Sequence, residues 1–445
     1  MTSQEQALAI ADRWLNPEDS VRPRREVRMR EFDLGWAVWA APAAPERDPE
    51  TGERRPPAEV GDACGVVDRR TGELTLWPSV PVDEVVRMYR RKHGGDAGEG
   101  ARGEEGTRAV TGPGNTAVFT YTDPASGEET TLFRTSGPGL PPAEHQAWAD
   151  LRRLNVPVDA VLAVHTDLRP SLLPGGYTAE LLNTFRHAQL SCSQTYGARP
   201  EVRAEGIAAL VEQVESTHRI AGQQPPPRPH RVPVPVPAQV TPAEPLRDVA
   251  LGHHLVEVFG QDGVRRYGAD DLTVGPLPEA TASTLTWAGL PADLPLFFTA
   301  DRPDAPPAGG LFTDVATNLR ERRSPAGEEK IAALAHLVRI GFDGVAVVAV
   351  QCRPGTGQPD GFGAVWAVDP VTAQARYLNV SAAAFARALA LLATVRRRMR
   401  GLDPVAAGQE VAWLQEQLVA VDASALANAE TWWSLIVEQM WHGLF

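Results

Sequence analysis

The sequence predicts a multidomain protein of mixed class, in which two α+β domains flank an α/β domain. Its 445 residues exceed what a single hydrophobic core usually supports. Two segments rich in glycine or proline, 91–115 and 222–245, interrupt the patterns typical of helices and strands. The remaining pieces alternate strand-like and helix-like patterns, so we expect domains at 1–90, 116–220 and 246–445.

The two interrupting segments have the composition of linkers. Residues 91–115 hold eight glycines, and a stretch of this kind buries little apolar surface. Residues 222–245 hold nine prolines, and alternating valine and proline favours an extended polyproline spacer. A docking peptide for another domain is the alternative interpretation of the second segment.

Charge and cysteine content narrow the class of protein. A net charge of −13 disfavours nucleic acid and anionic membranes as partners and favours a basic protein. The three cysteines, Cys64, Cys192 and Cys352, are far apart and predict a reducing compartment, the cytoplasm. The N-terminus lacks the pattern of a signal peptide, and no run approaches the ~20 apolar residues of a membrane span.

The first piece predicts a small α+β domain with the element order α-β-β-β-α. Ala7, Ala11 and Trp14 fall at helical spacing before Pro17, which ends the helix. The other expected elements are a strand at 27–40, a hairpin at 61–78 and a helix at 81–92.

Three short motifs stand out in this piece: Trp14-Leu15, Gly35-Trp36-Ala37-Val38, and Thr71-Gly72-Glu73-Leu74 running into Trp77-Pro78. They are similar to motifs of the YrhB-type immunity domains from bacterial toxin–immunity loci. The resemblance covers most of residues 5–90 and implies a domain that binds a toxin.

The middle piece predicts an α/β sandwich, because helices separate its later strands. Strands are expected at 116–123, 128–136, 158–166 and 188–195, and helices at 142–154, 178–185 and 203–214.

This element order resembles the zinc-dependent nucleotide deaminases. In those enzymes a His or Cys precedes a helix-opening Glu by two residues, and Pro-Cys-x-x-Cys opens a later helix. The glutamate corresponds to Glu144, but the three ligand positions correspond to Pro142, Ser171 and Pro174. Proline has no donor atom and a lone serine hydroxyl is a poor zinc ligand. The resemblance therefore implies a degenerate, non-catalytic domain with no metal and no cofactor.

Other donors in the middle piece do not form a recognisable metal motif. No pair among His145, His165, His187 and Cys192 shows a spacing such as His-x-x-x-His. The alternative is an unrelated α/β domain in which Glu144 is an ordinary first-turn carboxylate.

The last piece predicts an α+β domain in which a sheet is enclosed by helices. Asp343 and Asp369 are expected as turn residues, and Ser381 caps a long helix with an apolar stripe. The expected elements are a helix at 249–272, a strand at 294–301, a helix-rich segment at 317–340, a buried strand at 340–352, two strands within 361–381 and an apolar helix at 432–445.

Four motifs of the last piece resemble the SUKH superfamily of immunity proteins. They are Leu294-Pro295-Leu296-Phe297-Phe298, Ile340-Gly341-Phe342-Asp343-Gly344, Ala364-Val365-Trp366-Ala367-Val368-Asp369, and Leu378-Asn379-Val380-Ser381. The resemblance covers nearly all of the last 200 residues and is strongest to the fourth bacterial group. It implies an α+β domain that binds and blocks a cognate toxin in the cytoplasm of the producing cell.

Together these patterns favour a fusion of immunity domains that binds protein toxins, which we expect to be basic. Separately folded binding faces on flexible tethers suit such a task. Two alternatives remain: a nucleotide or nucleic-acid deaminase with an atypical metal site, and an intracellular scaffold that binds through 222–245.

Overall fold

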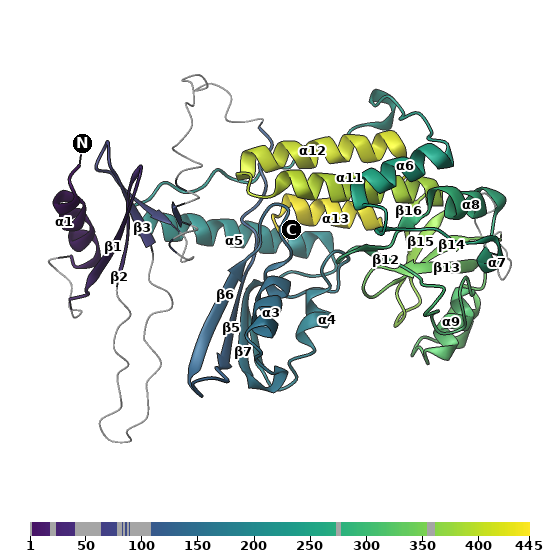
Figure 1. Cartoon of the computed structure of the whole chain (residues 1–445), viewed down its shortest axis with the longest axis horizontal. Coiled ribbons are helices and arrows are strands. Elements are labelled where there is room, and N and C mark those ends of the chain that lie inside the picture. The colour runs from purple at the N-terminus through teal and green to yellow at the C-terminus, as the bar shows by residue number, and fades with distance from the viewer. Residues whose placement is uncertain are drawn as a thin grey trace. The chain divides into compact units, whose positions relative to one another are not determined.

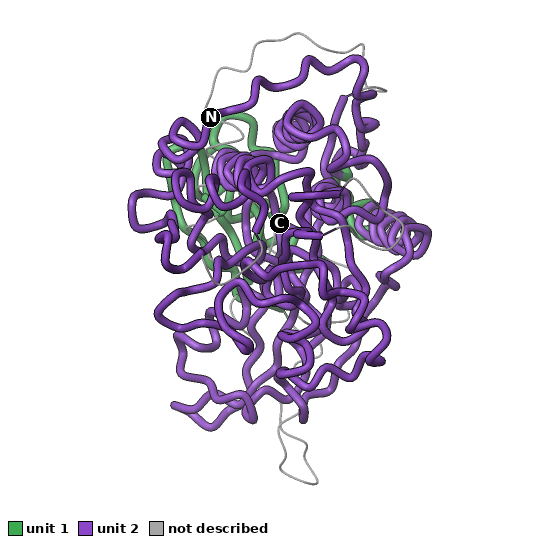
Figure 2. Tube along the Cα trace, turned by 90° about the vertical axis from the view of Figure 1, so that its right-hand side faces the viewer, with its two compact units in different colours: residues 1–104, 217–225 green, residues 105–216, 226–445 purple. Residues whose placement is uncertain are grey.

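The computed structural model describes residues 2–17, 24–40, 64–77, 82, 85, 86, 89, 108–272, 277–353 and 361–445. Their contacts group the chain into two compact units, shown in separate colours in Figure 2. Unit 1 comprises Met1–Glu104 and Thr217–Pro225, and unit 2 comprises Glu105–Ser216 and Pro226–Phe445. No helix among the described residues is both long enough and apolar enough to cross a bilayer.

Unit 1 holds helix α1 (Gln4–Leu15) and a four-stranded antiparallel sheet. The strands, in spatial order, are β1 (Val27–Phe32), β2 (Gly35–Ala40), β3 (Cys64–Asp68) and β4 (Leu74–Trp77). Ser3 begins α1 by accepting a hydrogen bond from the backbone N–H of Gln6, and the Gln6 side chain accepts from the Ser3 N–H. Ala7 and Ala11 of α1 pack against Trp36 on one face of the sheet.

The segment at 27–40, predicted as one strand, is a hairpin of β1 and β2, so the predicted α-β-β-β-α order was wrong. Asp33 and Leu34 form a two-residue turn between the strands, and the sequence prediction missed this turn. The helix expected at 81–92 lies mostly outside the described residues. Val85, Val86 and Tyr89 are helical and buried against the second face of the sheet.

In unit 2, the segment predicted as an α/β sandwich has the expected alternation of strands and helices. Its sheet has the order β6-β5-β7-β8, in which only β7 and β8 are parallel. Helix α3 packs Ala147 and Leu151 against Phe119 of the sheet. The elements are β5 (Thr116–Thr122), β6 (Glu129–Thr135), α3 (Ala143–Arg153), the 3-10 turn η1 (Val158–Ala160), β7 (Val161–Leu168), α4 (Thr178–Leu182), β8 (Gln189–Gln194) and α5 (Pro200–Ile220).

The C-terminal part of unit 2 is built on a six-stranded antiparallel sheet in the order β11 to β16. The strands are β11 (Asp293–Leu294), β12 (Phe298–Ala300), β13 (Leu337–Phe342), β14 (Val347–Gln351), β15 (Val365–Val368) and β16 (Ala375–Asn379). Val348, Val350 and Val365 face the same core as helices α11 (Ala382–Met399), α12 (Pro404–Val421) and α13 (Trp432–Trp441), which lie side by side (Figure 1).

Short helices cover the opposite face of this sheet. Val347, Ala349 and Val368 pack there with α9 (Val315–Glu321) and α10 (Glu328–Ala332). The remaining elements are η2 (Pro237–Gln239), α6 (Asp248–Phe259), β9 (Val264–Arg265), α7 (Ala269–Leu272), α8 (Glu279–Ser283), the π-helical η3 (Thr284–Ala288) and β10 (Leu290–Pro291). The predicted mixture of α+β and α/β segments is confirmed.

Two predicted elements of this part were wrong in extent. The helix at 249–272 is broken, because α6 ends at Phe259 and is capped by Gly260, a glycine with a φ of +81°. The single buried strand at 340–352 is the hairpin of β13 and β14, turned at Asp343. Helix α12 was not predicted at all. The cap at Ser381 is confirmed, since its side chain accepts a hydrogen bond from the Ala384 N–H.

The proline-rich segment 222–245 is not a free spacer, because part of it packs against unit 2. Val232, Val234 and Val240 pack against the core that α11, α12 and α13 share. Gln415 of α12 donates its side-chain N–H groups to the carbonyls of Val232 and Pro233. The plain-spacer interpretation of 222–245 was therefore wrong for this stretch.

The end of the glycine-rich segment is also packed. Residues 91–107 lie outside the described part of the chain, but Ala109 and Val110 are buried. The Gly112 N–H donates to the Trp441 carbonyl at 2.6 Å, and the Gly114 N–H donates to the His442 carbonyl at 3.0 Å. The middle and last pieces thus share one compact unit, whereas the limits of the three predicted domains stay a prediction.

Candidate functional site

Glu144, the residue that corresponds to the deaminase glutamate, is buried in the first turn of α3, with only 1% of its surface exposed. Its Oε1 accepts a hydrogen bond from Nδ2 of Asn115 at 2.9 Å. Its Oε2 is also buried and has no partner among the described residues. Burial raises the pKa of Glu144 to about 7, because water no longer solvates the ionised carboxylate.

A chain of hydrogen bonds connects Glu144 with the C-terminus of the protein. Asn115 donates from its backbone N–H to Oγ of Ser136 at 2.8 Å, and Ser136 donates to the carbonyl of Gly443 at 2.8 Å. Asn115 also accepts from the Leu168 N–H through Oδ1 at 2.9 Å. Asn115 therefore fixes Glu144 relative to both the middle sheet and the end of the chain. The sequence offered no pattern that would single out this asparagine.

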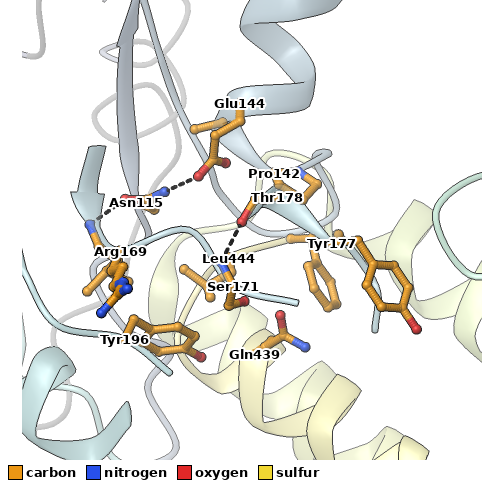
Figure 3. A pocket seen from close by; sticks show the side chains of 14 residues that line it. Asn115, Pro142, Glu144, Arg169, Ser171, Tyr177, Thr178, Tyr196, Gln439 and Leu444 are labelled. Carbon is orange, nitrogen blue, oxygen red and sulfur yellow. Dashed lines mark hydrogen bonds between the residues drawn. The ribbon is translucent and has the colours of Figure 1, made fainter. Parts of the chain in front are cut away.

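Pro142 and Ser171 line the same small cavity as Glu144 (Figure 3). The helix expected at 178–185 begins at Thr178 as α4, so Ser171 and Pro174 do not open a helix as the corresponding deaminase positions do. Ser171 lies in the loop before α4, where its N–H donates to Oγ1 of Thr178. Pro174 lies in the same loop. The structure thus places Pro142, Glu144 and Ser171 around one cavity, with Pro174 three residues after Ser171 in the loop.

These residues do not fit a zinc ion. Pro142 and Pro174 carry no side-chain donor atom, so Ser171 is the only hydroxyl among the three corresponding positions. The cavity measures about 30 Å³, which suits a water molecule rather than a nucleobase. Among the described residues there is no cluster of three or more His, Cys, Asp or Glu that could hold a metal.

The end of the chain lies against this cavity. Gln439 of α13 donates to the Pro174 carbonyl at 2.8 Å, and Leu444 and Phe445 line the cavity with it. A Cβ atom at Gly175 would lie 2.8 Å from Cζ of Phe445, so the loop approaches the C-terminal ring too closely for any other residue. The C-terminal helix and the four residues after it therefore close the side of the cavity opposite Glu144.

Two of the other candidate donors, His145 and His165, form hydrogen bonds, and two are exposed. Nε2 of His145 lies 2.6 Å from the Gly176 carbonyl, and burial lowers the pKa of His145. His165 lies within hydrogen-bond distance of the hydroxyls of Ser191 and Ser193 on the neighbouring strand, at 2.9 and 3.0 Å. His187 and Cys192 are exposed, as separate surface residues.

A buried ion pair joins the middle segment to α13. Arg203 of α5 is fully buried, and its Nε and one terminal nitrogen donate to the two carboxylate oxygens of Glu438, each at 2.8 Å. Such a bidentate pair is specific in geometry, and loss of one partner would leave a buried charge. Nearby, Tyr196 and His442 pair at 2.9 Å, and burial lowers the pKa of His442 to about 4.

Asp343 holds a second junction between the same segments. It is the predicted turn residue between β13 and β14, accepting from the backbone N–H groups of Val345 and Ala346. Its other oxygen accepts from the Tyr177 hydroxyl at 2.7 Å and from Nε1 of Trp432 at 2.8 Å. Burial raises the pKa of Asp343. The turn at Asp343 was predicted from the sequence but the junction was not, since no local pattern pairs residues so far apart.

A larger groove opens beside this junction. It has a volume of about 1040 Å³ and lies between the 169–198 segment on one side and the 345–377 and 424–432 segments on the other. Its lining includes Arg169, Leu172, Trp366, Asp369, Arg376 and Tyr377.

Comparison with protein families assigns three parts of the chain. Residues 5–96 match the Immunity protein 35-like domain, residues 112–213 match the Xanthomonas-like deaminase, and residues 250–439 match the SUKH-4 immunity protein. No curated protein and no solved structure matches the chain. The predicted layout, with immunity domains on both sides of a deaminase-like domain, is confirmed.

Proposed function

We propose, on the premise that this chain carries two immunity-protein domains around a deaminase-like domain, that it binds and neutralises a cognate protein toxin in the cytoplasm. The observation that carries the proposal is the SUKH-4 match over 250–439, which coincides with the six-stranded sheet and its three covering helices. The match to the Immunity protein 35-like domain at the other end of the chain supports the same role.

The deaminase-like domain acts in this proposal as a structural and binding element without catalysis. Three considerations support this: prolines stand at two of the corresponding ligand positions, the cavity beside Glu144 holds only a water-sized volume, and Phe445 lies against it. The deaminase alternative would require a donor set that these positions do not supply.

The toxin is a basic protein in this proposal, and nucleic acid is not bound directly. The net charge of −13 supports both statements, because an acidic inhibitor attracts a cationic partner and repels a polyanion. The affinity should then fall as salt rises, since salt screens exposed charges over roughly 10 Å at 0.1 M.

The scaffold alternative has less support. A docking peptide at 222–245 needs accessible side chains, whereas Val232, Val234 and Val240 are packed against the core. A binding partner would have to displace them first.

The test is co-expression of the full-length chain with each toxin domain encoded beside its gene, with growth as the readout. We expect growth to be restored for at least one toxin, and the purified pair to form a complex that weakens between 50 and 500 mM salt, concentrations chosen to span roughly 14 to 4 Å of screening length. If no toxin is bound or neutralised, the proposal is wrong.

Elemental analysis of the same purified protein tests the non-catalytic role. We expect far less than one zinc per chain, and no deamination of cytosine or adenine nucleotides. A stoichiometric zinc that is lost in a His145→Ala or Cys192→Ala variant would contradict this part of the proposal.

A further inference from the structure

The groove between the middle and C-terminal segments of unit 2 is built like an interaction surface. Its walls come from two segments that the family comparison assigns to different domains, the deaminase-like and the SUKH-4 segments. Tyr177 and Trp432 line the groove, one from each wall, and both donate hydrogen bonds to Asp343, which holds the two walls together. A groove fixed in this way needs little reorganisation to bind a partner, which favours affinity.

Large apolar side chains are exposed in the groove or next in sequence to the residues that line it. On one wall Leu172 lines the groove and is 61% exposed. On the other wall Phe362 and Val371 are 56% and 59% exposed, and each is adjacent in sequence to a lining residue, Gly361 or Thr372. Exposed apolar side chains that gather around a hollow are typical of a surface that another molecule covers.

The groove also holds unused hydrogen-bond donors. Nε1 of Trp366 is buried and has no partner among the described residues. Arg169 and Arg376 line the groove, and neither forms an ion pair with a described residue. Tryptophan, tyrosine and arginine are the residue types that contribute most to binding at protein interfaces.

We infer that this groove is the toxin-binding surface, and that it receives a protruding segment of the toxin carrying an apolar side chain beside carbonyl or carboxylate oxygens. The inference rests on the proposed immunity function. A small molecule in the hollow would leave the exposed apolar residues of both walls in water, whereas a protein covers them together. A stable protein complex buries about 1,600 Å² in total, which requires these residues as well as the hollow.

The test uses the full-length chain and a toxin domain that the wild-type chain neutralises in the co-expression assay. Leu172→Asp and Val371→Asp each place a charge on one wall, and we expect each to raise the dissociation constant about tenfold or more in calorimetry. Leu154→Asp is the matched control, because Leu154 is 51% exposed at the end of α3 and does not line the groove. It should change the dissociation constant less than about twofold.

Each outcome separates the inference from the function on which it rests. If the wild-type protein neutralises no toxin, both the proposed function and the inference about the groove are wrong. If it neutralises a toxin and both wall variants bind as tightly as wild type, while circular dichroism shows all proteins folded, the groove is not the binding surface and the function stands. Binding of cytidine or adenosine monophosphate that Leu172→Asp abolishes would assign the groove to a small ligand and overturn the inference.

Discussion

Glu144→Gln should stabilise the protein at alkaline pH and leave it nearly unchanged at acidic pH. In the folded chain the pKa of Glu144 is about 7, compared with an ordinary value of 4.5. The carboxyl group therefore keeps its proton in the folded state over a pH range where the unfolded state releases it. The contribution of Glu144 to the free energy of unfolding is therefore fully present below pH 4.5 and is lost as the pH rises through 7.

The magnitude follows from the difference between the two pKa values. One pKa unit corresponds to about 1.4 kcal/mol, so ionising Glu144 inside the fold costs about 3 kcal/mol by pH 8. Glutamine cannot ionise and can still accept the hydrogen bond from Asn115. We expect the gain in the free energy of unfolding to be below about 1 kcal/mol at pH 5 and about 3 kcal/mol at pH 8.

Urea unfolding followed by circular dichroism at both pH values measures this difference, with the slope of the transition compared to confirm the same unfolding event. Glu201→Gln is the control, because Glu201 occupies the first turn of α5 but is exposed. A Glu144→Gln gain that is equal at pH 5 and pH 8, or a loss at pH 8, would refute the argument from burial.

The contacts around α13 lead to three further predictions. Arg203→Met should lower the free energy of unfolding in urea by about 3–5 kcal/mol, because it leaves the buried Glu438 carboxylate without its partner. Adding Glu438→Leu should restore part of this loss, and additive losses in the double variant would contradict the prediction. Trp432→Ala should lower the free energy of unfolding in urea by about 3–5 kcal/mol, because the Trp432 side chain is buried. A decrease below about 1 kcal/mol would show that its burial contributes little to stability. A fragment of residues 246–445 should bind the dye ANS and aggregate, whereas a fragment of residues 108–445 should unfold in one cooperative transition. If both fragments behave alike in these two measurements, the middle segment adds nothing to the stability of the C-terminal core.

Helices and turns with local signals were predictable from the sequence. Ser381 caps α11 because its hydroxyl meets an N–H three residues on, and Asp369 forms the turn between β15 and β16 in the same way. The apolar face of 432–441 required burial whatever its neighbours. Such features depend on residues within one or two turns of each other, so a single sequence displays them.

The correspondence of the site residues with deaminase positions stays a prediction. Glu144, Pro142 and Ser171 line one cavity, since strand and helix order sets where these loops meet. Ser171 does not open a helix as the deaminase resemblance would imply, because Pro174, Gly175 and Gly176 lie in a loop before α4.

The sequence by itself determined that this chain has mixed α and β segments, immunity-type domains at both ends and a deaminase-like segment without zinc ligands. The tertiary structure alone decided that Val232, Val234 and Val240 pack against the C-terminal core, that Asp343 meets Tyr177 and that Phe445 lies against the cavity of Glu144. Each of these contacts joins residues more than a hundred positions apart. Periodicity reports which face of an element is buried but not which distant surface buries it, because that choice depends on the shape and polarity of both surfaces after folding.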